Sequence, residues 1–175
     1  MSDEIEKLRR EIDALDDRLA ALLNRRAHLA QRIGALKSGA PAYRPERETE
    51  ILRRVTQANA GPLSAERLAA VFREVISACR SLEETIRVSY LGPEGTFSEQ
   101  AVRKHFGRAV EGQPSGSVDD AFRRCESGAV QFAVVPVENS TEGVVGRTLD
   151  LLLATPLRIC AEIELRVQQN LLFKG

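Results

Sequence analysis

The chain has 175 residues, 43% of them hydrophobic, which is enough apolar material for one domain or for two small ones. Lys and Arg number 25 in total, as do Asp and Glu, so no net charge attracts nucleic acid or an anionic membrane. The N-terminal residues lack the basic and apolar regions of a secretory signal, and no apolar run is long enough to cross a bilayer.

Cysteine and histidine residues give no sign of a metal site. Cys79, Cys125 and Cys160 are far apart in the sequence and form no C-x-x-C pair. His28 and His105 are isolated from them and from each other. We therefore expect a cytoplasmic protein with reduced thiols, which uses neither a metal ion nor a cofactor.

The first predicted helix, over residues 3–37, carries a coiled-coil repeat. Ten positions share heptad spacing, nine apolar and one arginine: Ile5, Leu8, Ile12, Leu15, Leu19, Leu22, Arg26, Leu29, Ile33 and Leu36. A charge inside an apolar seam is costly unless an anion meets it, and Arg9 and Lys37 border the same face. These three cations predict a site for a small polyanion. The other interpretations are that Arg26 fixes coiled-coil register, that Arg9 is a solvated flank residue and that Lys37 complements the helix dipole.

Two shorter helices are predicted after the first one. One covers residues 45–58 with Pro45 in its first turn, and the other begins after the N-cap Ser64 and reaches about residue 85. At 1.5 Å per residue the first helix is about 50 Å long, too long for the two shorter helices to cover. We therefore predict an intertwined homodimer in which each long helix packs against its mate.

The sequence pattern changes from helical to alternating after residue 85. The predicted strands are 88–91, 131–137 and 157–165. One helix is predicted to begin near Ser98, two others cover 117–126 and 149–154, and a glycine-rich loop covers 142–148. This alternation predicts an α/β domain with a mostly parallel sheet. We thus expect two domains, a helical one over 1–86 and an α/β one over 87–175.

Two parts of the sequence resemble known families. Three segments of the first part resemble the all-helical chorismate mutases: LRREIDALDDRLAALLNRRAHLAQRIGALK (8–37), YRPERETEIL (43–52) and FREVISACRSLEE (72–84). Two segments of the second part resemble the catalytic domain of prephenate dehydratase: YLGPEGTFSEQA (90–101) and AVVPVENSTEGVVG (133–146). The whole is similar to the front part of a bifunctional chorismate mutase/prephenate dehydratase of phenylalanine biosynthesis. The resemblance implies an intertwined dimer of three-helix chains, followed by the beginning of a periplasmic-binding-protein-like α/β domain.

The resemblance to the mutases also implies roles for residues of the helical part. Arg26, together with Arg9 of the other subunit, would grip the two carboxylates of chorismate, as the forked guanidinium group favours. Lys37 would donate to a carboxylate and to the ether oxygen, whose bond to the ring breaks when prephenate forms. Glu48 would orient the ring hydroxyl, with Arg47 in support.

Three positions depart from the pattern of the mutase family. Many relatives have glutamine where this chain has Glu83, the second donor to the ether oxygen. A carboxyl group donates only when protonated, so we expect turnover to be favoured at low pH. The simpler interpretation is that Glu83 is an ordinary exposed acid. Cys79 stands where some relatives have a small hydroxyl, and Arg44 where some have an acid, so neither contact is carried over.

In the α/β part, the resemblance places Thr96, Ser98 and Asn139 in loops that line the prephenate cleft of the family. The GPEGTF segment (92–97) can also be read as a tight turn and helix cap only. No Thr-Arg-Phe triplet, which holds the threonine implicated in the family's dehydratase chemistry, follows Val88. The regulatory phenylalanine-binding domain is missing as well. We therefore expect an active mutase joined to an incomplete dehydratase domain that is inactive alone.

Two other classes of function stay open. In one, the helices are a non-catalytic dimerisation module and the seam serves assembly only. In the other, the α/β lobe binds a small molecule and the helices are its oligomerisation arm. Neither accounts for cations on the seam together with Glu48 and Glu83.

Overall fold

The structure is a computed structural model that describes residues 2–37, 43–141 and 143–167. The chain divides into two compact units, Met1–Thr85 and Ile86–Gly175. Among the described helices, none combines the length and the apolar character that a membrane span requires.

The first unit consists of three helices: α1 (Ser2–Leu36), α2 (Pro45–Gln57) and α3 (Ala65–Arg80). Proline at the first position of α2 has the backbone φ that a helix needs, and the Ser64 hydroxyl caps α3 by accepting from the Arg67 backbone N–H. Helix α3 packs against both α1 and α2. The predicted elements are confirmed, except that α3 ends at Arg80 and residues 81–83 form a turn instead of continuing the helix. Gly39 and Pro41, residues of a kind that breaks helices, follow α1 in the sequence and lie outside the described residues.

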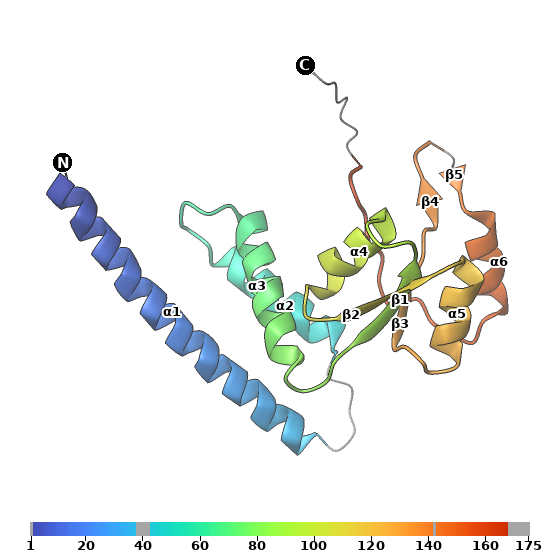
Figure 1. Cartoon of the computed structure of the whole chain (residues 1–175), viewed down its shortest axis with the longest axis horizontal. Helices are drawn as coiled ribbons and strands as arrows, with labels where there is room; N and C mark the ends of the chain where they lie inside the picture. Colours follow the sequence, from blue (N-terminus) through green and yellow to red (C-terminus); the bar gives the residue numbers. More distant parts are fainter. Residues whose placement is uncertain (1, 38–42, 142, 168–175) are drawn as a thin grey trace. The chain divides into compact units, whose positions relative to one another are not determined.

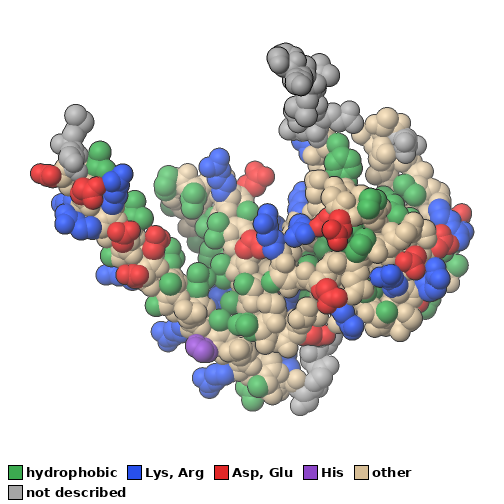
Figure 2. Space-filling view, viewed as in Figure 1, with side chains coloured by type: hydrophobic (Ala, Val, Ile, Leu, Met, Phe, Trp, Pro, Cys, Tyr) green, Lys and Arg blue, Asp and Glu red, His purple; other side chains and the backbone are tan. Residues whose placement is uncertain are grey.

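The N-terminal part of α1 is uncovered in the single chain. Every side chain described from residue 3 to residue 25 is exposed, and the seam residues Ile12, Leu15 and Leu22 are 57%, 55% and 61% exposed. Figure 1 shows this part of α1 extending past α2 and α3, and Figure 2 shows hydrophobic side chains among its charged ones. One chain therefore leaves a long apolar stripe in contact with water, at a cost of about 25 cal/mol for each Å².

The second unit is built on a small parallel sheet with strand order β2-β1-β3. Its elements in chain order are β1 (Arg87–Leu91), α4 (Phe97–Phe106), β2 (Glu111–Ser115), α5 (Val118–Glu126), β3 (Phe132–Val134), β4 (Glu138–Asn139), β5 (Gly143–Val144) and α6 (Gly146–Ala154). Helices α4 and α5 pack on the sheet and bury Val102, Phe106 and Phe122 with Val88 and Tyr90 of the central strand. The predicted α/β architecture is confirmed, as is Ser117 as the N-cap of α5.

The strand predictions for this unit are wrong in four places. Residues 157–165 form no strand, because no described strand pairs with them. The strand predicted over 131–137 is limited to β3, before Pro136, which has no N–H to donate to a sheet. The 142–148 segment, expected as a loop, contains β5 and the start of α6, while residue 142 lies outside the described part. Strand β2 was not predicted, because Glu-Gly-Gln-Pro-Ser lacks strand-forming residues. Among the described strands it pairs with β1 alone, at the edge of the sheet, where Pro114 is tolerated.

Candidate active site

Lys37 and Glu83 meet although they are far apart in the sequence. Lys37 follows the last residue of α1, and Glu83 lies in the turn after α3. The Lys37 Nζ atom is 3.5 Å from Glu83 Oε2, and the two side chains are only 23% and 13% exposed. The turn is fixed by a hydrogen bond of 2.8 Å from the Glu83 backbone N–H to the carbonyl of Arg80. Glu83 is therefore not an ordinary exposed acid, since it is sheltered and paired with a cation.

This ion pair borders a pocket of about 400 Å³, within the size range of small-molecule sites. The pocket is lined by Gln31, Gly34, Ala35, Lys37, Leu82, Glu83 and Glu84. The close approach of the turn to α1 depends on Gly34, because a Cβ atom there would lie 2.9 Å from Glu83 Cγ. No pattern in the sequence singled out Gly34, whose effect appears only when the turn and the helix are brought together.

A second ion pair joins α2 to α3. Arg80, at the end of α3, donates a hydrogen bond from Nη1 to Glu48 Oε1. Glu48 is 17% exposed and Arg80 4% exposed, and the Arg80 guanidinium lies over the ring of Tyr43 with its Cζ 5.1 Å from the ring centroid. Sequence reasoning assigned no role to Arg80. A signal was present, because Arg80 follows Ile76 by four residues and so continues the apolar face of α3.

The expected cations of α1 are not brought together within one chain. Arg26 is half-buried and lies three helical turns before Lys37, about 16 Å away along one face. Arg9 precedes Lys37 by 28 residues, or about 42 Å of helix, so its side chain cannot reach the pocket of its own chain. It pairs instead with Glu6, at 2.6 Å, in an exposed ion pair. Arg47 is likewise exposed and contacts Glu50 at 2.5 Å.

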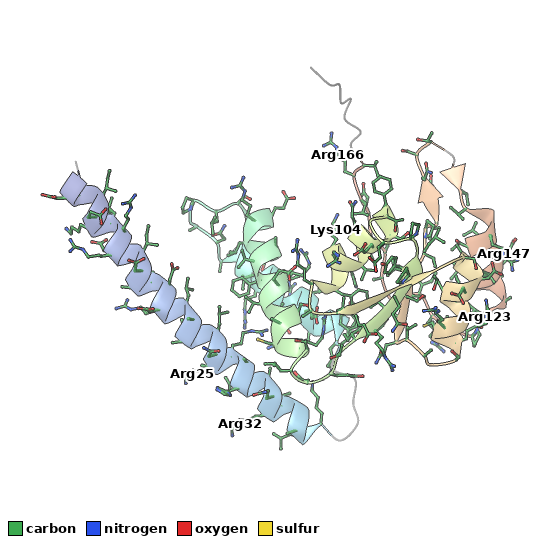
Figure 3. The ribbon with its side chains drawn as sticks, in the orientation of Figure 1. Arg25, Arg32, Lys104, Arg123, Arg147 and Arg166 are labelled. Atoms are coloured by element: carbon green, nitrogen blue, oxygen red, sulfur yellow. The ribbon has the colours of Figure 1, made fainter. Side chains whose placement is uncertain are left out.

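Other arginines of α1 face elsewhere. Arg25 and Arg32 are exposed and project from the side of the helix that faces away from α3 (Figure 3). Their position separates them from Lys37 and from the pocket, so the candidate site involves one side of the helix.

In the second unit, the expected residues follow two neighbouring parallel strands at their carboxyl ends, which is the usual position for ligands. Thr96 and Ser98 come after β1, and Asn139 comes after β3. The Thr96 hydroxyl donates to the Leu91 carbonyl at 3.1 Å and caps α4. The Asn139 side chain accepts from the Thr141 backbone N–H at 2.7 Å. Thr96 is thus the N-cap of α4, and Asn139 holds a turn in its own segment.

The first turn of α4 contains a strongly held carboxylate, Glu99. It accepts from the Gly95 backbone N–H at 2.6 Å and from Arg103 at 2.5 Å, and these contacts hold the pKa of Glu99 below its ordinary value of 4.5. A group whose pKa is lowered by folding stabilises the fold fully at pH values above its ordinary pKa, and this stabilisation is lost as pH falls through the lowered pKa.

We expect Glu99→Gln to lower Tm at pH 7 and to have a smaller effect below about pH 4. Thermal melts followed by circular dichroism, with Glu94→Gln as the control, check this; a Tm difference independent of pH would contradict it.

Chemically, the pocket offers the ammonium group of Lys37 beside the carboxylates of Glu83 and Glu84, and the Glu48–Arg80 pair is a separate contact between α2 and α3. Within the described residues, no three His, Cys, Asp or Glu side chains gather as ligands for a metal ion. Ammonium and guanidinium groups recognise carboxylates, and a held carboxylate such as Glu48 accepts from a hydroxyl. Within one chain, Lys37 is thus the cation that the described pocket presents to a carboxylate of a ligand.

Comparison with known proteins agrees with this division. Residues 88–175 match the family model for prephenate dehydratase, and residues 8–84 match chorismate mutase type II. Bifunctional chorismate mutase/prephenate dehydratases of Stutzerimonas stutzeri and Pseudomonas aeruginosa are 47% and 48% identical to the chain. The alignments cover 98% and 97% of this chain and 49% and 48% of those proteins, so the chain spans about half the length of these curated relatives.

A solved structure of chorismate mutase from Helicobacter pylori in complex with prephenate is 41% identical, with a TM-score of 0.44. That match covers 46% of this chain and 89% of the other. The two family matches follow each other along the sequence, and the bifunctional relatives align with nearly all of it. The chain therefore belongs to the family of bifunctional chorismate mutase/prephenate dehydratases.

Proposed function

We propose that the helical unit converts chorismate to prephenate, at a site formed around Lys37, Glu83 and Glu48. The observation that carries this proposal is the sheltered Lys37–Glu83 pair, which α1 and the turn after α3 bring together beside a pocket. The match of residues 8–84 to chorismate mutase type II supports it.

The chemistry requires positioning more than reactive groups. The rearrangement of chorismate is pericyclic: one C–O bond breaks as one C–C bond forms, with no nucleophile and no cofactor. A catalyst gains rate by holding the compact conformer and by placing positive charge where the ether oxygen becomes electron-rich. In this proposal Lys37 donates to that oxygen, Arg26 binds a carboxylate, and Glu48 accepts from the ring hydroxyl with Arg47 nearby.

The proposed enzyme is a homodimer with Arg9 supplied by the second copy. Two features support this: the uncovered apolar stripe on α1, and the distance of about 42 Å between Arg9 and Lys37 along one helix. The described core of the helical unit is also small, with Tyr43, Ile76 and Cys79 as its buried hydrophobic side chains. Pairing two long helices would bury the apolar stripe and bring Arg9 of the second copy to the pocket of the first.

The test of this function is the loss of chorismate absorbance, with prephenate identified as the product. Turnover by the 175-residue chain, abolished by changes at Lys37, supports the mutase. A folded dimer without turnover would favour the dimerisation module. A polypeptide of residues 1–87 that retains all activity would exclude the helices as a mere oligomerisation arm of the α/β lobe.

The proposed role of Glu83 as a donor to the ether oxygen can be tested through the pH profile of turnover. If Glu83 donates to the ether oxygen, it must be protonated, so turnover should rise as pH falls from 9 to 4.5. Glu83→Gln donates at every pH, so its profile should be flat on the acid side. The measurement is initial rates of chorismate loss for both proteins across this range; a flat wild-type profile would instead assign Glu83 the role of holding the Lys37 ammonium group in place.

For the second unit, we propose contact with prephenate through Thr96, Ser98 and Asn139, as part of the dehydratase activity of the family. The parallel arrangement of β1 and β3, which puts both loops at one edge, supports this. The full-length protein would then make phenylpyruvate for phenylalanine biosynthesis. We also propose a cytoplasmic location, with which the free thiols of Cys79, Cys125 and Cys160 agree. Binding of prephenate by the wild-type chain, weakened by Asn139→Ala, would test the site.

A further inference from the structure

Among the described residues, Arg80 is the one charged side chain that is buried, with 4% of its surface exposed. Burying a guanidinium group costs several kcal/mol unless its charge and its N–H groups are matched. The contacts of Arg80 therefore indicate what its burial achieves.

Those contacts connect both acids of the proposed site. The side chain of Arg80 donates to Glu48 Oε1 on α2. Its backbone carbonyl accepts from the Glu83 N–H at 2.8 Å and from the Glu84 N–H at 3.1 Å, which forms the turn that carries Glu83. One residue at the end of α3 thus contacts Glu48 through its side chain and Glu83 through its main chain.

The guanidinium group is itself held in place. Tyr43, 8% exposed, presents its ring to Arg80 with 5.1 Å between Cζ and the ring centroid. A planar cation stacked on an aromatic face has a defined orientation, which the flexible ammonium group of lysine lacks. Tyr43 therefore limits the orientations that Arg80 can offer to the Glu48 carboxylate.

We propose that Arg80 is a positioning residue of the mutase, which fixes the Glu48 carboxylate so that Oε2 accepts the ring hydroxyl of the substrate. This inference rests on the proposed function. Arg80 is too buried to touch the substrate, so it acts through Glu48. A displacement of about 1 Å at such a group lowers rates by up to about 100-fold.

The test is a double-mutant cycle on the full chain, with Arg80→Met, Glu48→Gln and the combination of both. If Arg80 acts through Glu48, each single change lowers kcat/KM for chorismate, and the double variant is no slower than the slower single variant. Arg80→Lys keeps the charge without the fork and should restore part of the rate. Arg67→Met, which removes an exposed arginine from the same helix, is the control and should match the wild type.

Three outcomes would overturn the proposal. They are wild-type kcat/KM in folded Arg80→Met, losses that multiply in the double variant, and full activity of Arg80→Lys together with full activity of Tyr43→Leu. If Arg80→Met does not fold, Arg80→Lys and Tyr43→Leu decide, because both keep a cation beside Glu48. Absence of turnover in the wild type would overturn the mutase function as well. An active wild type whose kcat/KM does not change when Arg80 is replaced would overturn this inference alone.

Discussion

Replacing Lys37 by methionine is expected to lower kcat/KM for chorismate about 100- to 1,000-fold, the usual cost of removing one preorganised donor to a developing negative charge. The ammonium group lies beside a sheltered carboxylate, where water screens charge poorly. Methionine keeps most of the length of lysine, and position 37 follows the end of α1, so the fold should be retained. The measurement is steady-state chorismate loss, with circular dichroism to confirm folding.

Arg32→Met is the matched control for this variant. Arg32 lies on the same helix but projects away from α3 (Figure 3), so removing its charge should leave kcat/KM unchanged. Equal losses in both variants would mean that the net charge of α1 matters and not a donor at Lys37. A Lys37→Met protein that remains fully active would remove Lys37 from the site.

Lysines at two seam positions, Leu15→Lys and Leu19→Lys, are expected to convert the proposed dimer to monomers of 19.3 kDa and to abolish the proposed turnover. Each leucine buried in a dimer contributes about 1.5–3 kcal/mol, and each lysine adds an unpaired charge. Sedimentation and activity at the same protein concentration measure both effects. Ala14→Lys with Ala21→Lys adds the same charges outside the seam and should change neither. Monomers that remain active would contradict a shared site.

A mixing experiment asks whether Arg9 crosses between subunits. Arg9→Met and Lys37→Met should each be inactive alone. In their heterodimers, Arg9 of one chain and Lys37 of the other complete one site of the two, so an equal mixture should recover about a quarter of the wild-type activity. No recovery, with heterodimers demonstrated by mass spectrometry, would place Arg9 outside the site.

Much of the fold could be predicted from local patterns. The heptad repeat identified α1, while Pro45, Ser64 and Ser117 marked helix starts, because caps and periodicity act within a few residues. Strand β2 could not be predicted, since its five residues have no strand propensity and depend on pairing with β1.

The candidate site was partly predictable for a related reason. Lys37, Glu48 and Glu83 could be assigned by resemblance, but the sequence alone did not indicate that Lys37 and Glu83 pair. Arg80 had no assigned role, because the function of a charged residue on an apolar helix face can be inferred only when its partner on another helix is known. Such long-range pairings depend on packing and not on local propensity.

Gly34 shows how a residue without a functional group can restrict the evolution of the proposed mutase site. Alanine at this point of α1 would be favoured by up to about 1 kcal/mol of helix propensity. Its methyl group would nevertheless occupy the space of the Glu83 side chain, 2.9 Å from Cγ, and push it from Lys37. In a library of variants screened for chorismate mutase activity, position 34 should therefore tolerate few substitutions, although helix propensity alone would favour alanine there.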